Sequence, residues 1–130
     1  MTAPELDLSI VIPVYNERDN LVPLEEKLET ELSKLNISYE IILIDDGSVD
    51  GSPHIINSLK KNNPRLKLIR FGHNHGQSAA FAAGFKAARG KIFVTLDADM
   101  QNNPADIPLL LEQMQDFDVV CGWRVKRNDP

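Results

Sequence analysis

The chain has 130 residues, which is enough for one domain built around one hydrophobic core. Its 42% hydrophobic and 25% charged residues are typical of folded soluble proteins and exclude disordered and fibrous classes. Nineteen acidic residues against 14 basic residues give a formal net charge of −5. This acidity argues against a nucleic-acid-binding protein, because such proteins present a basic face to phosphates.

The sequence also carries signals about the cellular compartment. Cys121 is the only cysteine and has no internal partner for a disulfide, so we expect a reducing compartment. No run approaches the roughly 18 apolar residues that a membrane-spanning helix needs. The acidic first residues lack the basic segment of a signal peptide. These features predict a cytoplasmic location.

Five short apolar runs predict β-strands. Each is almost continuously apolar, which is typical of strands buried on both faces of a parallel sheet. The runs cover residues 8–13, 39–44, 66–71, 92–96 and 117–121.

Helical patterns lie between these runs. Apolar residues recur at spacings of three and four, which places them on one face of a helix. The third helix is rich in alanine and is predicted to end at Gly90 as its C-cap, and the fourth begins at Pro104. The apolar positions are Leu21, Leu24, Leu28, Leu32 and Leu35; Ile55, Ile56 and Leu59; Ala79 to Ala88 with Phe81 and Phe85; and Ile107, Leu110, Leu111 and Met114.

The alternation of strands and helices predicts a three-layer α/β/α fold with a mostly parallel, doubly wound sheet. Only nine residues follow the last predicted strand, and none of them forms a helix that would cover the end of the sheet. We therefore expect residues 1–130 to be part of a longer domain, truncated at its C-terminal end. The alternative is that the last strand is a tolerated sheet edge.

Polar residues cluster where the predicted strands end. Ligands of open parallel sheets bind beyond the carboxyl ends of the strands. We therefore expect these segments to line one crevice. They are residues 13–17, 45–51, 73–77, 97–101 and 122–127.

Asp97, Asp99 and Gln101 are the strongest candidates for a metal site. Their hard oxygen atoms suit Mg²⁺ or Mn²⁺ better than zinc, and such a cation can neutralise a diphosphate. Alternatively, the two carboxylates only satisfy turn N–H groups before a helix.

The other polar segments allow more than one interpretation. One carboxylate of the segment 45–50 binds a base or ribose, or the segment only forms a turn at Gly47, with Ser48 or Asp50 capping the next helix. Tyr15 either stacks on a base, with Glu17 accepting a hydrogen bond from it, or packs at the sheet edge. Asn16 is a candidate N-cap for the first helix.

Two groups of basic or titratable residues are also ambiguous. His73 and His75 lack further zinc ligands at suitable spacing and are interpreted as loop histidines. Arg124, Lys126 and Arg127 form either a solvated tail or a diphosphate-binding group. Motifs of dinucleotide-binding folds, P-loops and hydrolase elbows are absent from the sequence.

Three segments resemble the inverting GT-A glycosyltransferases of family 2: SIVIPVYNE at 9–17, IDDGS at 44–48, and LDADMQ at 96–101 followed by Pro104. The segments GQSAA at 76–80, with Gly84, and GWR at 122–124 extend the resemblance. The stretch DADMQNNP at 97–104 is similar to the subgroup that acts on polyprenyl phosphates, such as dolichyl-phosphate mannose synthases. That subgroup usually has leucine in place of Met100.

The resemblance implies a nucleoside-diphosphate-sugar donor, with UDP or GDP as the nucleotide, and most simply a polyprenyl-phosphate acceptor. It implies catalytic roles for Asp97, Asp99 and Arg124, and a divalent cation, Mg²⁺ or Mn²⁺, held by Asp97, Asp99 and Gln101. The residues implied in nucleotide binding are Pro13, Tyr15, Glu17, Asp46, Ser48, Gly76, Asp97 and Arg127. Contact with the cytoplasmic face of a membrane is expected only through a region beyond Pro130.

Two hypotheses from different classes remain open. The chain is part of an enzyme that transfers a sugar to a lipid phosphate or, alternatively, to a saccharide hydroxyl, which would require a carboxylate base. Otherwise it is a module that binds nucleotide and metal without chemistry of its own. A receiver-like signalling domain is disfavoured because Lys126 is badly placed for it.

Overall fold

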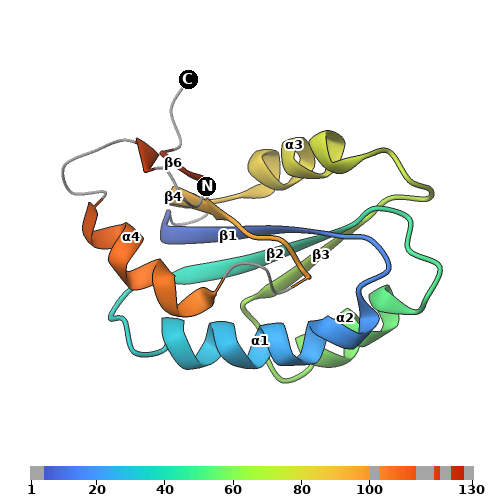
Figure 1. The fold of residues 1–130 in the computed structure, drawn as a ribbon, viewed down its shortest axis with the longest axis horizontal. Helices are drawn as coiled ribbons and strands as arrows, with labels where there is room; N and C mark the ends of the chain where they lie inside the picture. The colour runs from blue at the N-terminus through green and yellow to red at the C-terminus, as the bar shows by residue number, and fades with distance from the viewer. Residues whose placement is uncertain (1–4, 100–102, 114–118, 121–123, 128–130) are drawn as a thin grey trace.

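The computed structural model describes residues 5–99, 103–113, 119–120 and 124–127. Strands and helices alternate through most of the chain (Figure 1). In chain order the elements are β1 (Leu6–Val14), α1 (Arg18–Leu32), β2 (Tyr39–Asp45), α2 (Ser52–Lys60), β3 (Leu66–Arg70), α3 (Gln77–Ala87), β4 (Gly90–Thr95), the 3₁₀ turn η1 (Pro104–Asp106), α4 (Ile107–Gln113), β5 (Val119–Val120) and β6 (Arg124–Arg127).

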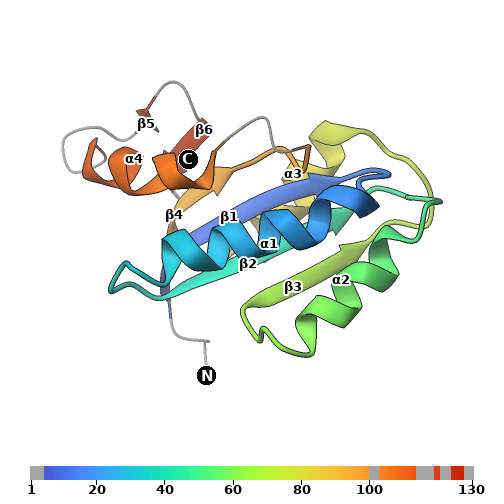
Figure 2. The same cartoon turned by 60° about the horizontal axis from the view of Figure 1, so that its bottom comes forward.

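The strands form one sheet in the order β3-β2-β1-β4-β6-β5. The first four strands are mutually parallel, and β6 runs antiparallel to both of its neighbours. Helices α1, α2 and α4 cover one face of the sheet, and α3 covers the other (Figures 1 and 2). The predicted three-layer, mostly parallel, doubly wound fold is therefore confirmed.

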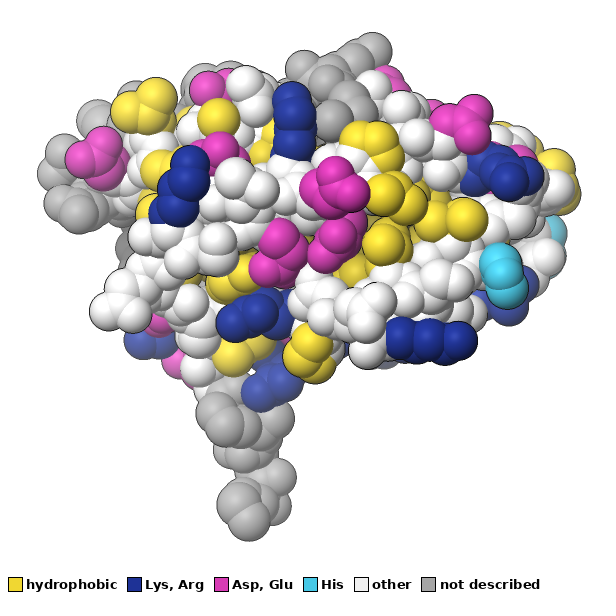
Figure 3. Space-filling model, turned by 90° about the horizontal axis from the view of Figure 1, so that it is seen from below, with side chains coloured by type: hydrophobic (Ala, Val, Ile, Leu, Met, Phe, Trp, Pro, Cys, Tyr) yellow, Lys and Arg dark blue, Asp and Glu magenta, His cyan; other side chains and the backbone are white. Residues whose placement is uncertain are grey.

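Each face of the sheet has its own hydrophobic core. The larger core joins β1 and β2 to the leucine face of α1, where Leu21, Leu24, Leu28 and Leu32 are at most 2% exposed. The smaller core lies under α3 around Ala80. The outer face of the layer formed by α1, α2 and α4 carries interspersed acidic and basic side chains (Figure 3), which is typical of a solvated surface.

The structure corrects the predicted role of Gly90. Helix α3 ends at Ala87, and the following Ala88 is extended, so Gly90 is not its C-cap. Gly90 instead begins β4, and a Cβ atom there would lie 2.5 Å from the Ser9 backbone nitrogen. A glycine is therefore needed where β4 starts against β1.

The end of the described chain also differs from the prediction. Residues 124–127 form the antiparallel strand β6, inserted between β4 and β5, rather than a tail. Their sequence, RVKR, contains one apolar residue and so lacks the apolar run by which the other strands were recognised. Cys121 lies outside the described residues.

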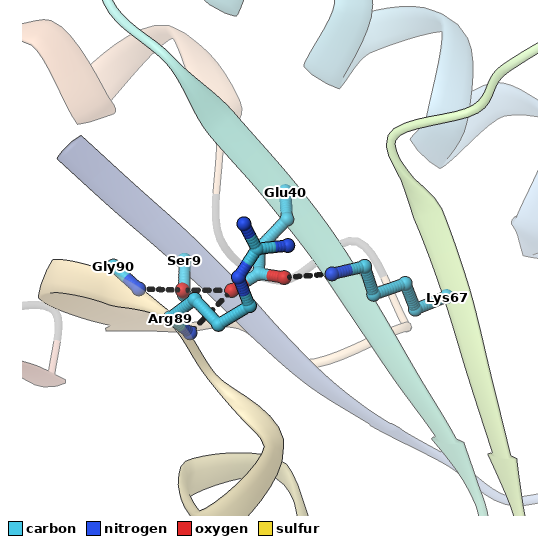
Figure 4. A network of polar contacts seen from close by, with 5 residues as sticks. All are labelled: Ser9, Glu40, Lys67, Arg89 and Gly90. Atoms are coloured by element: carbon cyan, nitrogen blue, oxygen red, sulfur yellow. Dashed lines mark hydrogen bonds and ion pairs between the residues drawn. The ribbon is translucent and has the colours of Figure 1, made fainter. Parts of the chain in front are cut away.

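A polar network crosses the sheet at the start of its strands (Figure 4). Glu40 of β2 is 1% exposed. Its carboxylate accepts hydrogen bonds from Ser9 Oγ, Lys67 Nζ and the Arg89 backbone N–H, each at 2.6 Å. Ser9 Oγ in turn accepts one from the Gly90 N–H at 2.8 Å. The network ties β1, β2 and β3 to the start of β4, at the opposite end of the sheet from the polar strand exits.

Candidate functional site

A cleft of about 300 Å³ opens at the carboxyl ends of the parallel strands. It is formed by the segments that follow β1, β2, β3 and β4, because the parallel strands bring these exits to one edge. The lining residues are Pro13, Val14, Tyr15, Glu17, Asp46, Asn74, Gly76, Gln77, Asp97, Ala98 and Asp99. The structure thus brings together most of the predicted site residues.

The side of the cleft next to β1 is apolar and aromatic. Tyr15 lines it and is 48% exposed, so its ring is available to a ligand and does not pack at the sheet edge. Glu17 immediately precedes α1, and its Oε2 accepts a hydrogen bond from Asn20 Nδ2 at 2.8 Å. An aromatic face beside a carboxylate can stack on a nucleobase and accept one of its N–H groups.

Asp46 anchors the loop between β3 and α3. It is 4% exposed, and its Oδ1 accepts from the His75 N–H at 2.7 Å. Its Oδ2 accepts from the Gly76 N–H at 2.9 Å and from Asn74 Nδ2 at 3.2 Å. Because a carboxylate offers about four acceptor positions, Asp46 holds this loop and retains capacity for one donor of a ligand.

Gly47 explains how this loop lies so close to β2. It has a φ of +77°, and a Cβ atom there would lie 2.5 Å from the Asn74 nitrogen and the His73 carbonyl carbon. Both the backbone conformation and the contact therefore require glycine. The rings of His73 and His75 contact each other at a tilt of 39°, with centroids 4.2 Å apart, and no metal-binding group of three or more suitable side chains occurs among the described residues.

Asn16 and Ser48 join the loops after β1 and β2. Ser48 Oγ accepts a hydrogen bond from the Asn16 N–H, and Asn16 Oδ1 accepts one from the Val49 N–H, both at 2.8 Å. Glu17, not Asn16, occupies the N-cap position of α1, so the predicted cap is wrong. Ser48 does not line the cleft, and its hydroxyl serves this loop contact.

Asp50 strengthens the same junction. Its carboxylate accepts from Ser52 Oγ at 2.6 Å and from the Arg18 N–H at 3.1 Å. Desolvation works to raise its pKa, but these hydrogen bonds outweigh it and hold the pKa of the Asp50 carboxyl below its ordinary value. Helix α2 itself begins after Gly51, which takes the N-cap position.

The Asn16 junction yields a stability prediction. Asn16 has a φ of +54°, a left-handed conformation that asparagine tolerates better than alanine. We expect Asn16→Ala to lower the free energy of unfolding by about 1–3 kcal/mol, since it adds backbone strain and removes the bond to Val49. Asn16→Gly should lower the free energy of unfolding by less, because glycine relieves the backbone strain. Urea unfolding of both variants measures the difference, and equal losses would contradict the role given to the backbone.

Asp97 and Asp99 lie on the other side of the cleft, in the turn after β4. Gln77 Nε2, at the first residue of α3, donates to Asp97 Oδ1 at 3.3 Å. Asp97 Oδ2 has no hydrogen-bond partner within the described part of the chain. Asp99 is exposed at the cleft. The side chain that caps η1 is that of Asn103, whose Oδ1 accepts from the Ala105 N–H.

The donor set fits a hard divalent cation. Asp97 and Asp99 supply carboxylate oxygens at an open cleft, which leaves room for phosphate oxygens and water as further ligands. With Glu17 and Asp46, four carboxylates line the cleft, so a bound diphosphate would need a cation for charge compensation. Gln101, the third predicted metal ligand, lies outside the described residues.

The strand register separates the two predicted diphosphate-binding arginines. Arg124 pairs with Thr95, two residues before Asp97, whereas Arg127 pairs with Ile92. At about 3.4 Å per residue, Arg127 is about 10 Å farther from the cleft along β6. The backbone therefore places Arg124 closer to the cleft than Arg127.

The sequence did not identify every residue that shapes the cleft. Asn74 and Gln77 were recognised only as polar residues after a predicted strand, and no role was predicted for either. Their positions depend on the path of the β3–α3 loop, which Asp46 and Gly47 determine. Their only sequence signal is their position at a strand exit.

The fold and the cleft define the class of protein. The chain superposes on a mannosyltransferase of Pyrobaculum calidifontis solved with GDP-Man and Mn²⁺, with a TM-score of 0.70 and 23% identity over 90% of this chain and 34% of that one. It also superposes on TarS 1–349 of S. aureus, solved with UDP-GlcNAc, with a TM-score of 0.67 and 21% identity over 85% of this chain and 31% of that one. The fold is that of GT-A glycosyltransferases.

Sequence comparison gives the family. Residues 9–130 match the model of glycosyl transferase family 2, and the chain belongs to that family. It is 44% identical over 124 residues to the undecaprenyl-phosphate 4-deoxy-4-formamido-L-arabinose transferase of Aeromonas hydrophila subsp. hydrophila, covering 94% of this chain and 38% of that protein. It is 36% identical over 129 residues to the dodecaprenyl-phosphate galacturonate synthase of Rhizobium johnstonii, covering 95% and 38% respectively. The chain thus spans less than two-fifths of the length of these relatives.

Proposed function

We propose that the chain is the nucleotide-sugar-binding part of an inverting, metal-dependent glycosyltransferase that transfers a sugar from a UDP- or GDP-sugar to a polyprenyl phosphate. The observation that carries the proposal is the cleft itself, in which an exposed tyrosine and two acceptor carboxylates on one side face Asp97 and Asp99 on the other. Both relatives named above have polyprenyl phosphates in their names, which supports this acceptor class.

Each side of the cleft has a separate task in this proposal. The nucleoside is held by Pro13, Tyr15, Glu17 and Asp46. Gly76 keeps the loop between β3 and α3 close to Asp46, because its N–H donates to the Asp46 carboxylate. Asp97, Asp99 and Gln101 hold Mg²⁺ or Mn²⁺, which when bound neutralises charge on the nucleoside diphosphate as it leaves. Arg124 supports the same phosphates from β6, and Arg127 is a more distant contributor.

In the reaction, an acceptor oxygen forms a bond to the anomeric carbon while the bond from that carbon to the β-phosphate oxygen breaks. The nucleoside diphosphate leaves with the electron pair of the broken bond. Attack from the opposite face inverts the anomeric centre. A phosphate oxygen is already anionic near neutral pH and so needs no general base, whereas a saccharide hydroxyl would need one.

A binding role without transfer is the second candidate. It is favoured by the observation that the chain spans only 38% of each relative, so acceptor recognition can lie elsewhere in the relatives. Within the described residues no helix is long and apolar enough to span a membrane. In our proposal, contact with the cytoplasmic face of a membrane is made by a region of the full-length protein beyond Pro130.

Calorimetric titration of the chain with UDP and with GDP, each with and without Mn²⁺, tests the proposal. We expect one nucleotide to bind, with an affinity that rises when Mn²⁺ is present. Sugar transfer to a polyprenyl phosphate by the same chain would then distinguish an enzyme from a binding module. A folded chain that binds neither nucleotide would contradict the proposal.

A further inference from the structure

The segment after β3 contacts the carboxylates on both sides of the cleft. Asp46 follows β2 and Asp97 follows β4, and strand β1 lies between those two strands. Neighbouring strands are about 4.8 Å apart, so the two exits are separated by about 10 Å. The Gly76 N–H donates to Asp46 Oδ2, and the next residue, Gln77, donates to Asp97 Oδ1. Two consecutive residues therefore bridge the exits of β2 and β4.

The geometry at Gly76 makes this bridge possible. Gly76 has φ 99° and ψ 160°, a conformation essentially restricted to glycine, and α3 begins at the next residue. Helix α3 is in turn held against the sheet by Gly84, where a Cβ atom would lie 2.8 Å from Ile44 Cδ1. The backbone of Gln77 is thus fixed from both sides, and its side chain is directed toward Asp97.

From these contacts we infer that Gln77 is a positioning residue for Asp97. Its amide binds Oδ1, which turns the carboxylate so that Oδ2 is presented to a cation in the cleft. Partners of this kind that orient a metal-binding carboxylate typically change metal affinity by 10- to 100-fold. Because Gln77 touches Asp97 and not the nucleoside side of the cleft, it should affect the cation more than the nucleotide. This inference rests on the proposed function.

The test compares Gln77→Met with Ser78→Ala. Methionine keeps the length of the side chain and removes the donor. Ser78 is exposed in the same first turn of α3 and does not line the cleft, so it serves as the matched control. The measured quantity is the apparent Mn²⁺ affinity at saturating UDP or GDP, taken from the electron paramagnetic resonance signal of free Mn²⁺. Calorimetry without metal gives the affinity for the nucleotide alone.

We expect Gln77→Met to weaken Mn²⁺ binding about 10-fold. Nucleotide affinity without metal should stay within about twofold, and Ser78→Ala should match the unmodified chain in both measurements. Unchanged Mn²⁺ affinity in Gln77→Met would overturn the positioning role, as would an equal loss of nucleotide affinity without metal. If the unmodified chain shows no Mn²⁺-dependent nucleotide binding at all, the proposed function itself fails, which is a different result.

Discussion

Replacing Asp99 with asparagine is expected to abolish Mn²⁺-dependent nucleotide binding and to leave the chain folded. Asparagine has nearly the same shape but removes the negative charge that a hard cation needs. We expect about a 100-fold loss of Mn²⁺ affinity in the presence of nucleotide, since the amide oxygen that remains carries no charge to attract the cation. Because Asp99 is exposed, the free energy of unfolding should change by only about 0.5 kcal/mol.

The measurement is calorimetric titration of UDP and GDP into Asp99→Asn, with and without Mn²⁺. Without metal, binding should equal that of the unmodified chain or be slightly tighter, because one carboxylate no longer repels the diphosphate. Asp106→Asn is the matched control, since Asp106 is an exposed carboxylate of η1 that does not line the cleft. Metal-dependent binding that survives in Asp99→Asn would remove this residue from the proposed metal site.

The arrangement of the sheet was predictable because its central strands are buried on both faces. Strand β2 is buried at every residue, and its apolar run stands out against the helical spacing of the leucines in α1. Strand β6 could not be recognised in this way. Its four residues, RVKR, contain one apolar residue, so pairing with β4 rather than hydrophobic patterning makes it a strand.

The candidate site was predictable by position but not by contact. A parallel sheet brings its strand exits together, so Tyr15, Asp46 and Asp97 were correctly expected in one crevice. Two of the three partners of the Asp46 carboxylate are backbone N–H groups 29 and 30 residues later in the chain, and no sequence pattern encodes them. The contact of Ser48 with the neighbouring loop could not be predicted either, since its partner Asn16 lies 32 residues away.

Loss of the Glu40 carboxylate should produce a large decrease in the stability of the fold. Its three donors come from different segments, and its side chain is 2% exposed. Glu40→Ala would leave Ser9 and the Arg89 N–H without their acceptor and create a cavity. We expect the free energy of unfolding to fall by about 3 kcal/mol, measured by urea unfolding at pH 7. Lys67 is 41% exposed and can be hydrated, so it adds little to this loss.

The same carboxylate predicts how stability depends on pH. Burial acts to raise its pKa, but the hydrogen bonds from Lys67, Ser9 and the Arg89 N–H together hold the pKa of Glu40 below its ordinary value of 4.5. A lowered pKa in the folded state means that the ionised carboxylate stabilises the fold above pH 4.5, and that this stabilisation is lost as the pH falls through the folded value. The difference in free energy of unfolding between the unmodified chain and Glu40→Gln should therefore be constant near neutral pH and should decrease below pH 4.5.

Urea unfolding between pH 7 and pH 3 measures this narrowing. Glu26→Gln is the control, because Glu26 is exposed on α1 and its side chain makes no hydrogen bond to other described residues. The free energy of unfolding of Glu26→Gln should equal that of the unmodified chain at every pH. The contrary result would be that the unmodified chain and Glu40→Gln differ in free energy of unfolding by the same amount at every pH down to 3. That result would mean that the charge of Glu40 contributes nothing to the network. Its hydrogen bonds alone would then hold β1, β2 and β3 to the start of β4 at the end of the sheet opposite the cleft.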